Sequence, residues 1–316
     1  RKMRLLLAAD ITDKAQLAAL AASNAISSAF SVLGSAFIVT VYLAYPDLRE
    51  SSSHIFYLSL ADIFNSLTGF LGDPDEGSLA CYVQSIGSQY FGLASVFFTV
   101  VIAYVLHRAV VLRMPEVPSD LHRRFHIFVW GIAGALTLLP LVSSSYGDSG
   151  AWCWIKNDAP VDRWMRLVAF YLPVWASIVY DVFVYVKVYT TLKRALSMAT
   201  VSNGPTKPRS RDFRAIRRLG YYPMILSGCY VFATINRIEN MIRPDDAVFS
   251  LYLLSSLSTN SMGFWNMLAY GLNSSVRAKL RGTLRRLRIL GEAPIVGGGE
   301  EPSRAPAEEG EEEEEG

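Results

Sequence analysis

The apolar residues of the chain fall into seven blocks, each long enough to cross a lipid bilayer, and short polar connections separate the blocks. A bilayer core about 30 Å thick is crossed by roughly 20 helical residues. The predicted spans cover residues 25–45, 54–71, 81–105, 125–146, 165–189, 214–243 and 248–272. We therefore predict an all-α membrane protein in which a seven-transmembrane helix bundle, residues 23–272, follows an N-terminal segment, residues 1–22.

The sixth block differs from a plain membrane anchor. It carries no charge from residue 219 to residue 235, yet it contains Pro223 and Gly228. Arg237 and Glu239 lie where the hydrocarbon region should end. Sharp bends in helices occur mostly at proline and glycine positions. We predict a helix that pivots near Pro223 and Gly228, with a polar cluster at one end.

The first block contains many small residues, namely Ser27, Ser28, Ser31, Gly34 and Ser35. Small side chains at a membrane helix interface allow two backbones to approach closely. We therefore expect another helix to pack tightly against this span.

Two further segments follow the bundle. Residues 273–290 place apolar side chains on one helical face among arginines, at Val276, Leu280, Leu284, Leu287 and Leu290. A basic amphipathic helix of this kind is typical of the inner membrane interface, where anionic lipids hold it. Residues 291–316 include nine glutamates from residue 300 onward. Such a block of like charge forms no core, so it is predicted to be a disordered acidic tail.

Basic residues are distributed unevenly between the two sides of the membrane. Twenty lie in the connections after spans one, three and five and in the segment after span seven, whereas the opposite connections hold four. Cytoplasmic loops collect Lys and Arg. The N-terminus is therefore predicted to be extracellular and the C-terminus cytoplasmic, in a multi-pass protein of the plasma membrane. With 51% hydrophobic and 18% charged residues, the chain does not resemble an ordinary soluble domain.

Several enzyme and cofactor classes do not fit the residues. The four histidines, His54, His107, His122 and His126, lie at the predicted cytoplasmic edge. His122 and His126 have i,i+4 spacing without an evident third ligand, so packing is the favoured interpretation over a metal site. The last span has no lysine for a retinal, and the chain has no glycine-rich phosphate loop. We predict no enzymatic activity, metal or cofactor, and no nucleic acid polymer as a partner.

Two of the three cysteines lie beside predicted outer connections. Cys81 opens span three and Cys153 lies in the second outer loop, whereas Cys229 is within span six. A disulfide between Cys81 and Cys153 on the oxidising side would tie that loop across the helix ends. The alternative is two unpaired thiols.

Ionisable residues inside a membrane are costly and usually face the bundle interior or a wet cavity. Asp62 lies near the middle of span two, and the last span offers Asn260, Ser261, Asn266 and Tyr270 as polar neighbours. We predict that Asp62, Asn260, Asn266 and Tyr270 form an intramembrane polar switch that shares a proton or small cation. A plain interhelical hydrogen bond without a switching role is the alternative.

A second polar group is predicted at the outer mouth. Arg237 and Glu239 are two residues apart, so on a helix they point in different directions and do not pair. Each therefore needs another partner or a ligand, and both are predicted to contribute to a ligand site. Arg237, with Lys156, Arg163 and Arg166 of the outer connection, suits an anionic ligand. The alternative is an arginine that extends from the helix end to the lipid headgroups.

Three segments resemble a known family. FYLSLADIF, RRLGYYPMILSGCYVFATINRIEN and LSTNSMGFWNMLAYGLNSSVR are similar to segments of the cyclic-AMP chemoattractant receptors (class E) and their cyclic-AMP-receptor-like relatives among G-protein-coupled receptors. The most distinctive parts are TINRI in span six and GFxNxxxYGLN in span seven. Class A receptors instead carry Asp-Arg-Tyr after span three and Asn-Pro-x-x-Tyr in span seven, where this chain has LHRAV and NMLAY.

The resemblance implies a cell-surface receptor that binds an extracellular agonist and activates a heterotrimeric G protein. It also implies that Arg237 corresponds to the arginine of the family's span-six motif, and Cys81 and Cys153 to its disulfide. The tail departs from the family pattern, because it is rich in glutamate and has Ser303 as its one serine. The ligand is predicted to be anionic and nucleotide-like, with cyclic AMP as one candidate.

The sequence thus predicts a receptor whose sixth span pivots to open a cytoplasmic cavity. Arg108, Arg217 and Arg218 are predicted to line the rim of that cavity and face the G protein. A transporter or channel using Asp62 and Asp181 is the main alternative, and a heptahelical protein without a ligand is a third. Membrane lipids are expected partners in every case.

Overall fold

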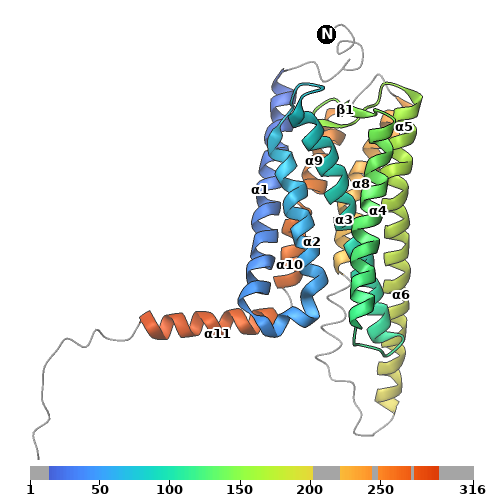
Figure 1. Ribbon diagram of the computed structural model, residues 1–316. Coiled ribbons are helices and arrows are strands. Elements are labelled where there is room, and N and C mark those ends of the chain that lie inside the picture. Colours follow the sequence, from blue (N-terminus) through green and yellow to red (C-terminus); the bar gives the residue numbers. More distant parts are fainter. Residues whose placement is uncertain (1–13, 202–220, 244–247, 272–273, 292–316) are drawn as a thin grey trace, which may run out of the picture. The chain divides into compact units, whose positions relative to one another are not determined.

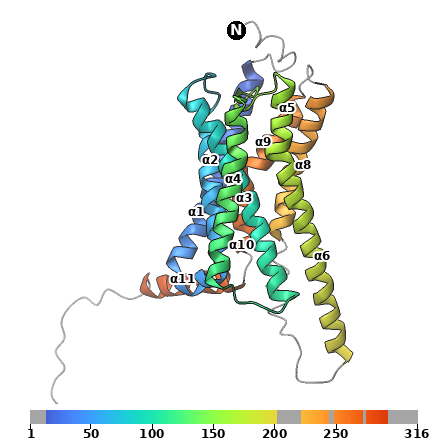
Figure 2. The ribbon, with the colours of Figure 1, turned by 45° about the vertical axis from the view of Figure 1, so that its right-hand side comes forward.

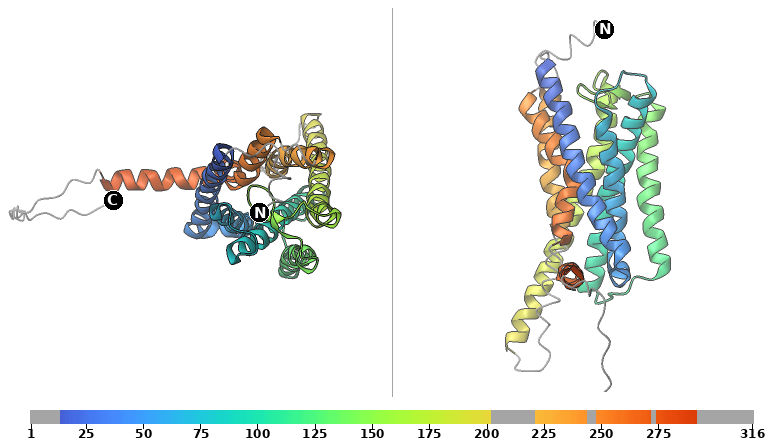
Figure 3. Two further views of the ribbon diagram at one scale, coloured as in Figure 1. Left: turned by 90° about the horizontal axis from the view of Figure 1, so that it is seen from above. Right: turned by 90° about the vertical axis from the view of Figure 1, so that its left-hand side faces the viewer.

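The computed structural model describes residues 14–201, 221–243, 248–271 and 274–291, and it is mostly helical (Figure 1). The chain divides into two units, Arg1–Ala278 and Lys279–Gly316. The first unit is a bundle whose helices surround its long axis, as the view along that axis shows (Figure 3, left). The predicted acidic tail and the first part of the N-terminal segment lie outside the described residues.

Every predicted span coincides with helical structure in its described part. The helices are α1 Lys14–Ala44, α2 Arg49–Thr68, α3 Leu79–Val110, α4 Ser119–Val142, α5 Pro160–Arg166, α6 Leu172–Val201, α8 Tyr221–Ile242, α9 Phe249–Asn260, α10 Met262–Gly271 and α11 Ser274–Gly291. Short turns, η1 Pro46–Leu48 and η2 Gly69–Leu71, flank α2. Because α1 begins at Lys14, it includes part of the segment predicted to precede the bundle.

Helix α3 occupies the centre of the bundle. It contacts α2, α4, α6 and α8, and most of its middle turns are buried. Among the described residues, four helical stretches are long and apolar enough to cross a membrane: Ala15–Ala44, Leu79–Val110, Ser119–Val142 and Pro160–Ala195. The helices of span seven, α9 and α10, are 12 and 10 residues long, so each by itself is shorter than a bilayer crossing requires.

Span seven is broken at Ser261, which the sequence analysis did not predict. Ser261 has non-helical dihedral angles, and its carbonyl accepts from the amides of Phe264 and Trp265 at the start of α10. The hydroxyls of Ser258 and Thr259 both donate to the carbonyl of Ser255. Ser and Thr side chains that bond to the backbone compete with the helical ladder and often bend helices. The polar run before α10 therefore accounts for the break.

Helix α4 ends at Val142 rather than at Tyr146, where span four was predicted to end. Tyr146 instead begins a short strand, β1 Tyr146–Asp148, which pairs with β2 Cys153–Ile155 in an antiparallel hairpin. The hydroxyl of Tyr146 donates to the carbonyl of Thr137 in α4 at 2.9 Å. Burial raises the pKa of Tyr146, which keeps this donor protonated. The predicted boundary was wrong because the three serines at residues 143–145 form the turn that ends α4, with Ser144 at a positive φ of 54°.

Span five contains one wide turn. Residues Leu167–Tyr171 (η3) form a π-helical turn between α5 and α6, in which the amide of Leu172 donates to the carbonyl of Leu167. Turns of this kind are rare within helices and are frequent at functional sites. Here the wide turn changes the direction of the side chains that precede α6.

The close packing predicted for the first span is present, and α10 is the helix involved. A Cβ atom added at Gly34 would lie 2.8 Å from the carbonyl oxygen of Gly263 and 2.8 Å from the Cα atom of Phe264. The amide of Gly263 also donates to the hydroxyl of Ser31 at 3.1 Å. The backbones of α1 and α10 are therefore too close to admit a side chain between them.

We expect Gly34→Val to lower the free energy of unfolding by about 1–3 kcal/mol, the usual cost of overpacking. The valine would meet backbone atoms, which cannot rotate away. Gly131→Val is the matched control, because a Cβ at Gly131 in α4 meets no atom within 4 Å. Thermal unfolding of both variants by circular dichroism would measure the difference. Equal melting temperatures for the two variants would contradict the prediction.

The second unit contains the larger part of α11. In this part Arg281, Arg285 and Arg286 are exposed, and Leu284 is 65% exposed. The side chains of Leu287 and Leu290 lie outside the described set. A helix therefore covers residues predicted to be amphipathic and basic, while its location at the membrane surface stays a prediction.

Candidate ligand-binding site

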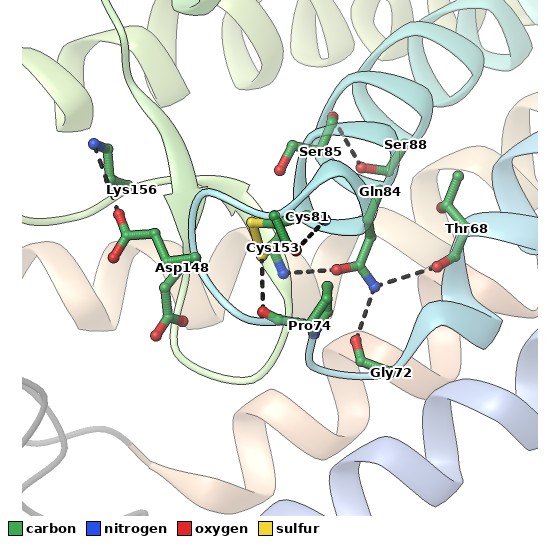
Figure 4. Close-up of a disulfide and its surroundings, with 12 residues drawn as sticks. Thr68, Gly72, Pro74, Cys81, Gln84, Ser85, Ser88, Asp148, Cys153 and Lys156 are labelled. Carbon is green, nitrogen blue, oxygen red and sulfur yellow. Dashed lines mark hydrogen bonds and ion pairs between the residues drawn. A yellow bond between two sulfur atoms is a disulfide. The ribbon is translucent and has the colours of Figure 1, made fainter. Parts of the chain in front are cut away.

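A disulfide closes one end of the bundle, which we call the disulfide end. Cys81, in the first turn of α3, is bonded to Cys153 in β2, with sulfur atoms 2.02 Å and Cα atoms 5.2 Å apart (Figure 4). Ser78 caps α3 by accepting from the amide of Cys81. The predicted pairing of Cys81 with Cys153 is confirmed, and it fixes the hairpin against the central helix.

Gln84, one turn after Cys81, strengthens the same attachment. Its side-chain amide donates to the carbonyls of Thr68 and Gly72, and its side-chain oxygen accepts from the amide of Cys153 at 2.8 Å (Figure 4). Because both its side-chain nitrogen and its side-chain oxygen are hydrogen-bonded, the buried Gln84 holds the end of α2 and the hairpin in one arrangement. The hairpin is therefore held in place by the disulfide and by Gln84.

Trp154 of β2 lies at the centre of the site. Its Nε1 atom donates to the side-chain oxygen of Gln89 at 2.9 Å, and the amide of Gln89 donates to the carbonyl of Ala169 in the π-helical turn at 2.9 Å. The Trp154 ring packs edge to face with Phe170 and Tyr171 of the same turn. The hairpin, α3 and span five thus meet at one tryptophan.

Two buried arginines lie against this tryptophan. The guanidinium carbons of Arg166 and Arg237 are each 5.6 Å from the centre of the Trp154 ring, and Arg237 is also 5.7 Å from the ring of Tyr252. Arg166 donates from Nε to the carbonyl of Ile155, and Arg237 donates from Nε to the hydroxyl of Tyr171. Aromatic rings stabilise a cation without neutralising it. Within the described residues, no carboxylate lies within salt-bridge distance of either guanidinium.

The arginines border two cavities. A side cavity of about 220 Å³ lies between the α5–α6 segment and α8, and Arg163, Arg166 and Arg237 line it. A central cavity of about 120 Å³ lies beneath the hairpin, and its walls combine polar side chains, such as Asn24 and Asn260, with aromatic ones. Arg237 and Tyr171 line both cavities, so Arg237 lies between them.

Two guanidinium nitrogens are left without a partner. Arg237 is 8% exposed, and its Nη1 atom has no hydrogen-bond partner among the described residues. The Nε atom of Arg163 is also buried without a partner there. An unsatisfied buried donor costs about 1–3 kcal/mol, and more when it is charged. An anion bound at these nitrogens would remove that cost.

The structure brings together three of the five residues predicted to bind the ligand. Lys156 is apart from them, because its Nζ atom lies 3.9 Å from a carboxylate oxygen of Glu76 and it lines neither cavity. Glu239 also lines neither cavity. Arg163, Arg166 and Arg237 remain the candidates.

Asp62 forms the centre of a second polar cluster deep in the bundle. It is 2% exposed and accepts from the hydroxyl of Ser95 at 2.6 Å and from the side-chain amide of Asn266 at 2.8 Å. Asn260 was expected here but donates to Asn24 of α1 instead. Tyr270 is 1% exposed and lies one turn beyond Asn266. Asn260 is on the other side of the break at Ser261, which explains the different partner.

The other intramembrane carboxylate, Asp181, is separate from this cluster. It is fully buried and accepts from the hydroxyl of Thr99 at 2.9 Å. Neither Asp62 nor Asp181 lines the side cavity or the central cavity. These two cavities therefore give no support to a transport path along the carboxylates.

The structure describes only some of the residues that were predicted to face the G protein or to form the pivot of span six. Arg108, in the last turn of α3, donates to the carbonyl of Glu116, whereas Arg217 and Arg218 lie outside the described residues. Helix α8 continues without a break through Pro223 and Gly228. A Cβ at Gly228 would meet no atom within 4 Å. The pivot stays a prediction.

The histidines of α4 contact each other directly. The Nε2 atoms of His122 and His126 are 3.2 Å apart, and Trp130 donates to Nδ1 of His126. The ring of His54 lies 5.0 Å from that of His122. In the described part of the chain, no group of three or more His, Cys, Asp or Glu side chains is arranged to hold a metal ion.

Several important residues were missed from the sequence. Gln89, Trp154 and Tyr171 at the ligand site and Ser95 at Asp62 were not predicted. Gln84 and Gln89 stand out as two amides in the apolar third span, five residues apart. Because polar residues in membrane helices usually face the bundle interior, this spacing was a usable signal.

The chain is similar in fold and in sequence to proteins of the G-protein-coupled receptor class. The crystal structure of squid rhodopsin superposes on this chain with a TM-score of 0.69, covering 90% of this chain and 89% of that one at 17% identity. Residues 15–287 match the family described as slime mold cyclic AMP receptor. The chain therefore belongs to that family and is a cyclic-AMP-receptor-like member of the receptor class.

Two curated relatives show the range of the family. "G-protein coupled receptor 1" of Arabidopsis thaliana is 37% identical over 259 residues, which cover 81% of this chain and 78% of the relative. "Cyclic AMP receptor-like protein A" of Dictyostelium discoideum is 25% identical over 248 residues, which cover 78% of this chain and 62% of the relative. Family and fold together point to a membrane receptor rather than an enzyme.

Proposed function

We propose that this protein is a plasma-membrane receptor that binds an extracellular anionic small molecule at Arg237 and activates a heterotrimeric G protein. The observation that carries the proposal is the pair of buried, unpartnered guanidinium nitrogens on Arg237 and Arg163. Charge-assisted bonds from arginine to phosphate or carboxylate are among the strongest in proteins. Arg166, which lines the same cavity, supplies further positive charge.

Binding at this site acts on several elements at once. Arg237 belongs to α8, Tyr171 to the π-helical turn of span five, and Trp154 to the hairpin. A ligand that binds one packing of these elements more tightly shifts the equilibrium toward it. In the proposed mechanism α8 moves about Pro223 and Gly228. The opposite end then opens near Arg108, Arg217 and Arg218, on the cytoplasmic side.

The membrane orientation is part of the proposal. A disulfide is stable in an oxidising compartment, which favours an extracellular disulfide end. The excess of basic residues in the other connections favours a cytoplasmic opposite end. The N-terminus would then be extracellular and the C-terminus cytoplasmic.

Arg237→Gln tests the ligand site. We expect it to raise the half-maximal agonist concentration about 10- to 150-fold, because a hydrogen bond to a charged group contributes about 1.5–3 kcal/mol. The measurement is agonist-stimulated nucleotide exchange on a purified G protein by the full chain in nanodiscs, with a panel of anionic nucleotides that includes cyclic AMP.

Arg243→Gln is the matched control, because Arg243 is exposed at the end of the same helix. It removes the same charge and should respond within about twofold of the unaltered protein, as expected for a surface substitution. A normal response from Arg237→Gln would contradict the proposed site. Ligand-free solute flux through the protein in liposomes would instead favour a transporter.

A further inference from the structure

We propose that the ligand is an amphiphilic anion with a single apolar chain, and that this chain occupies the side cavity between span five and α8 from the outer lipid leaflet. This inference rests on the proposed anion site at Arg237 and adds the chemical class of its ligand. A phosphate or carboxylate would bind the arginines, and the chain would lie on the apolar wall below them.

The apolar wall of the side cavity is the first observation. Beyond the arginines, the apolar part of the lining is formed by Leu167, Trp175 and Ile238. The polar residues Asn157, Tyr171 and Asn240 also line the cavity. Thr234 also borders it, but its hydroxyl donates to the carbonyl of Tyr230 and accepts from Nε1 of Trp175 at 3.1 Å. These polar atoms already have partners. A fully polar ligand would therefore leave this wall without a matching surface.

The position of the cavity opening is the second observation. α6 and α8 lie side by side at one edge of the bundle (Figure 2). The cavity lies between α8 and the part of span five from Arg163 to Trp175. Ile238 lines the cavity and is 53% exposed, and Ile235, one turn away on the same helix, is 45% exposed. Exposed isoleucines of a membrane-spanning helix face lipid. The side cavity therefore reaches the lipid-facing surface.

The depth of the arginines is the third observation. Arg237 precedes the end of α8 at Ile242 by five residues, which is about 7.5 Å of helix. In the proposed orientation α8 ends among the outer lipid headgroups, and Arg237 would lie near their boundary with the hydrocarbon. The nearest acidic residue of α5, Asp162, accepts from the amide of Ala159 at 3.0 Å and so caps its own helix. The three arginines thus offer positive charge at headgroup level.

The size of the cavity limits the ligand. At about 220 Å³ it is smaller than the roughly 300–1,000 Å³ of typical enclosed ligand sites. It therefore holds one end of a slender molecule, while the remainder lies along the lipid-facing surface. A single acyl chain meets this limit better than a two-chain lipid.

The test uses the purified full chain in phosphatidylcholine nanodiscs and three radiolabelled probes. Lysophosphatidate has one chain and a phosphate, glycerol 3-phosphate is its headgroup alone, and lysophosphatidylcholine has the chain without net charge. We expect saturable binding of lysophosphatidate at least tenfold tighter than that of glycerol 3-phosphate, and no saturable binding of lysophosphatidylcholine. Equal affinities for lysophosphatidate and glycerol 3-phosphate would overturn the inference but leave a simple anion site.

Two substitutions on one face of α8 test where the apolar chain of the ligand lies. Ile238→Trp fills the side cavity. It should lower the affinity for lysophosphatidate at least tenfold, toward the affinity for glycerol 3-phosphate. Ile235→Trp adds the same ring outside the cavity and should bind like the unaltered protein. Unchanged binding by Ile238→Trp would overturn the side-cavity assignment. Unchanged binding of both anions by Arg237→Gln would instead overturn the proposed function.

Discussion

Replacing Cys81 and Cys153 together with serine should lower the free energy of unfolding by about 4 kcal/mol. The two cysteines are 72 residues apart, and loop-closure entropy for a loop of this length gives about that value. Both must be replaced, because a single change leaves a reactive thiol at the mouth of the site. Chemical or thermal unfolding followed by circular dichroism, in one detergent for all variants, would measure the loss.

The disulfide variant should also lose ligand affinity, because the hairpin carries Trp154 against both arginines. Cys229→Ala is the matched control, since Cys229 is a buried free cysteine in α8, outside the hairpin. Cys229→Ala should lower the free energy of unfolding by about 1 kcal/mol, as for an average substitution. If the double serine variant were as stable as Cys229→Ala, the disulfide would not stabilise the fold.

The apolar blocks were sufficient to predict the helices of the bundle, because a bilayer crossing needs a long apolar segment whatever the tertiary packing. Helix ends were harder to place. Tyr146 was predicted to end span four, yet three serines separate it from the apolar residues of α4, and it lies in a strand where its hydroxyl donates to the carbonyl of Thr137. Periodicity alone cannot separate a short buried strand from the last turn of a helix.

The hydrogen-bond partners of side chains inside the bundle depend on where helices break, and the sequence pattern does not predict the position of such a break. Asn260 and Asn266 were both expected to reach Asp62, although six residues of continuous α-helix already place two side chains about 120° apart around the axis. The break at Ser261 separates them, so Asn266 reaches Asp62 and Asn260 reaches Asn24. Composition identified the polar residues correctly, but the tertiary structure selected their partners.

The ligand site was predicted in part for a similar reason. Positive charge at one end of the bundle is visible from Arg163, Arg166 and Arg237, since the connections predicted on that side hold four basic residues against twenty on the other. Lys156 has the same charge but pairs with Glu76, a contact across two loops. Trp154 was not predicted, because aromatic residues are common in membrane proteins and their burial depends on the hairpin.

Asp62→Leu should lower the free energy of unfolding by about 2–6 kcal/mol. It leaves two buried donors, the Ser95 hydroxyl and the Asn266 amide, without their acceptor, and each costs about 1–3 kcal/mol. Adding Ser95→Ala and Asn266→Leu to Asp62→Leu should recover most of the loss, because removing all the partners of a buried network is nearly neutral. Thermal unfolding of the single and triple variants would measure both effects.

Asp62→Asn separates a switch from a plain hydrogen bond. Asparagine keeps an acceptor for Asn266, and its amide can donate to Ser95, so stability should change by less than about 1 kcal/mol. An amide cannot take up a proton or a cation as a carboxylate does. We therefore expect agonist-stimulated nucleotide exchange to fall at least tenfold in this variant.

Asp181→Asn, which changes a carboxylate outside the cluster, should signal normally. If Asp62→Asn were both stable and fully responsive, the cluster would be an interhelical hydrogen bond with no switching role.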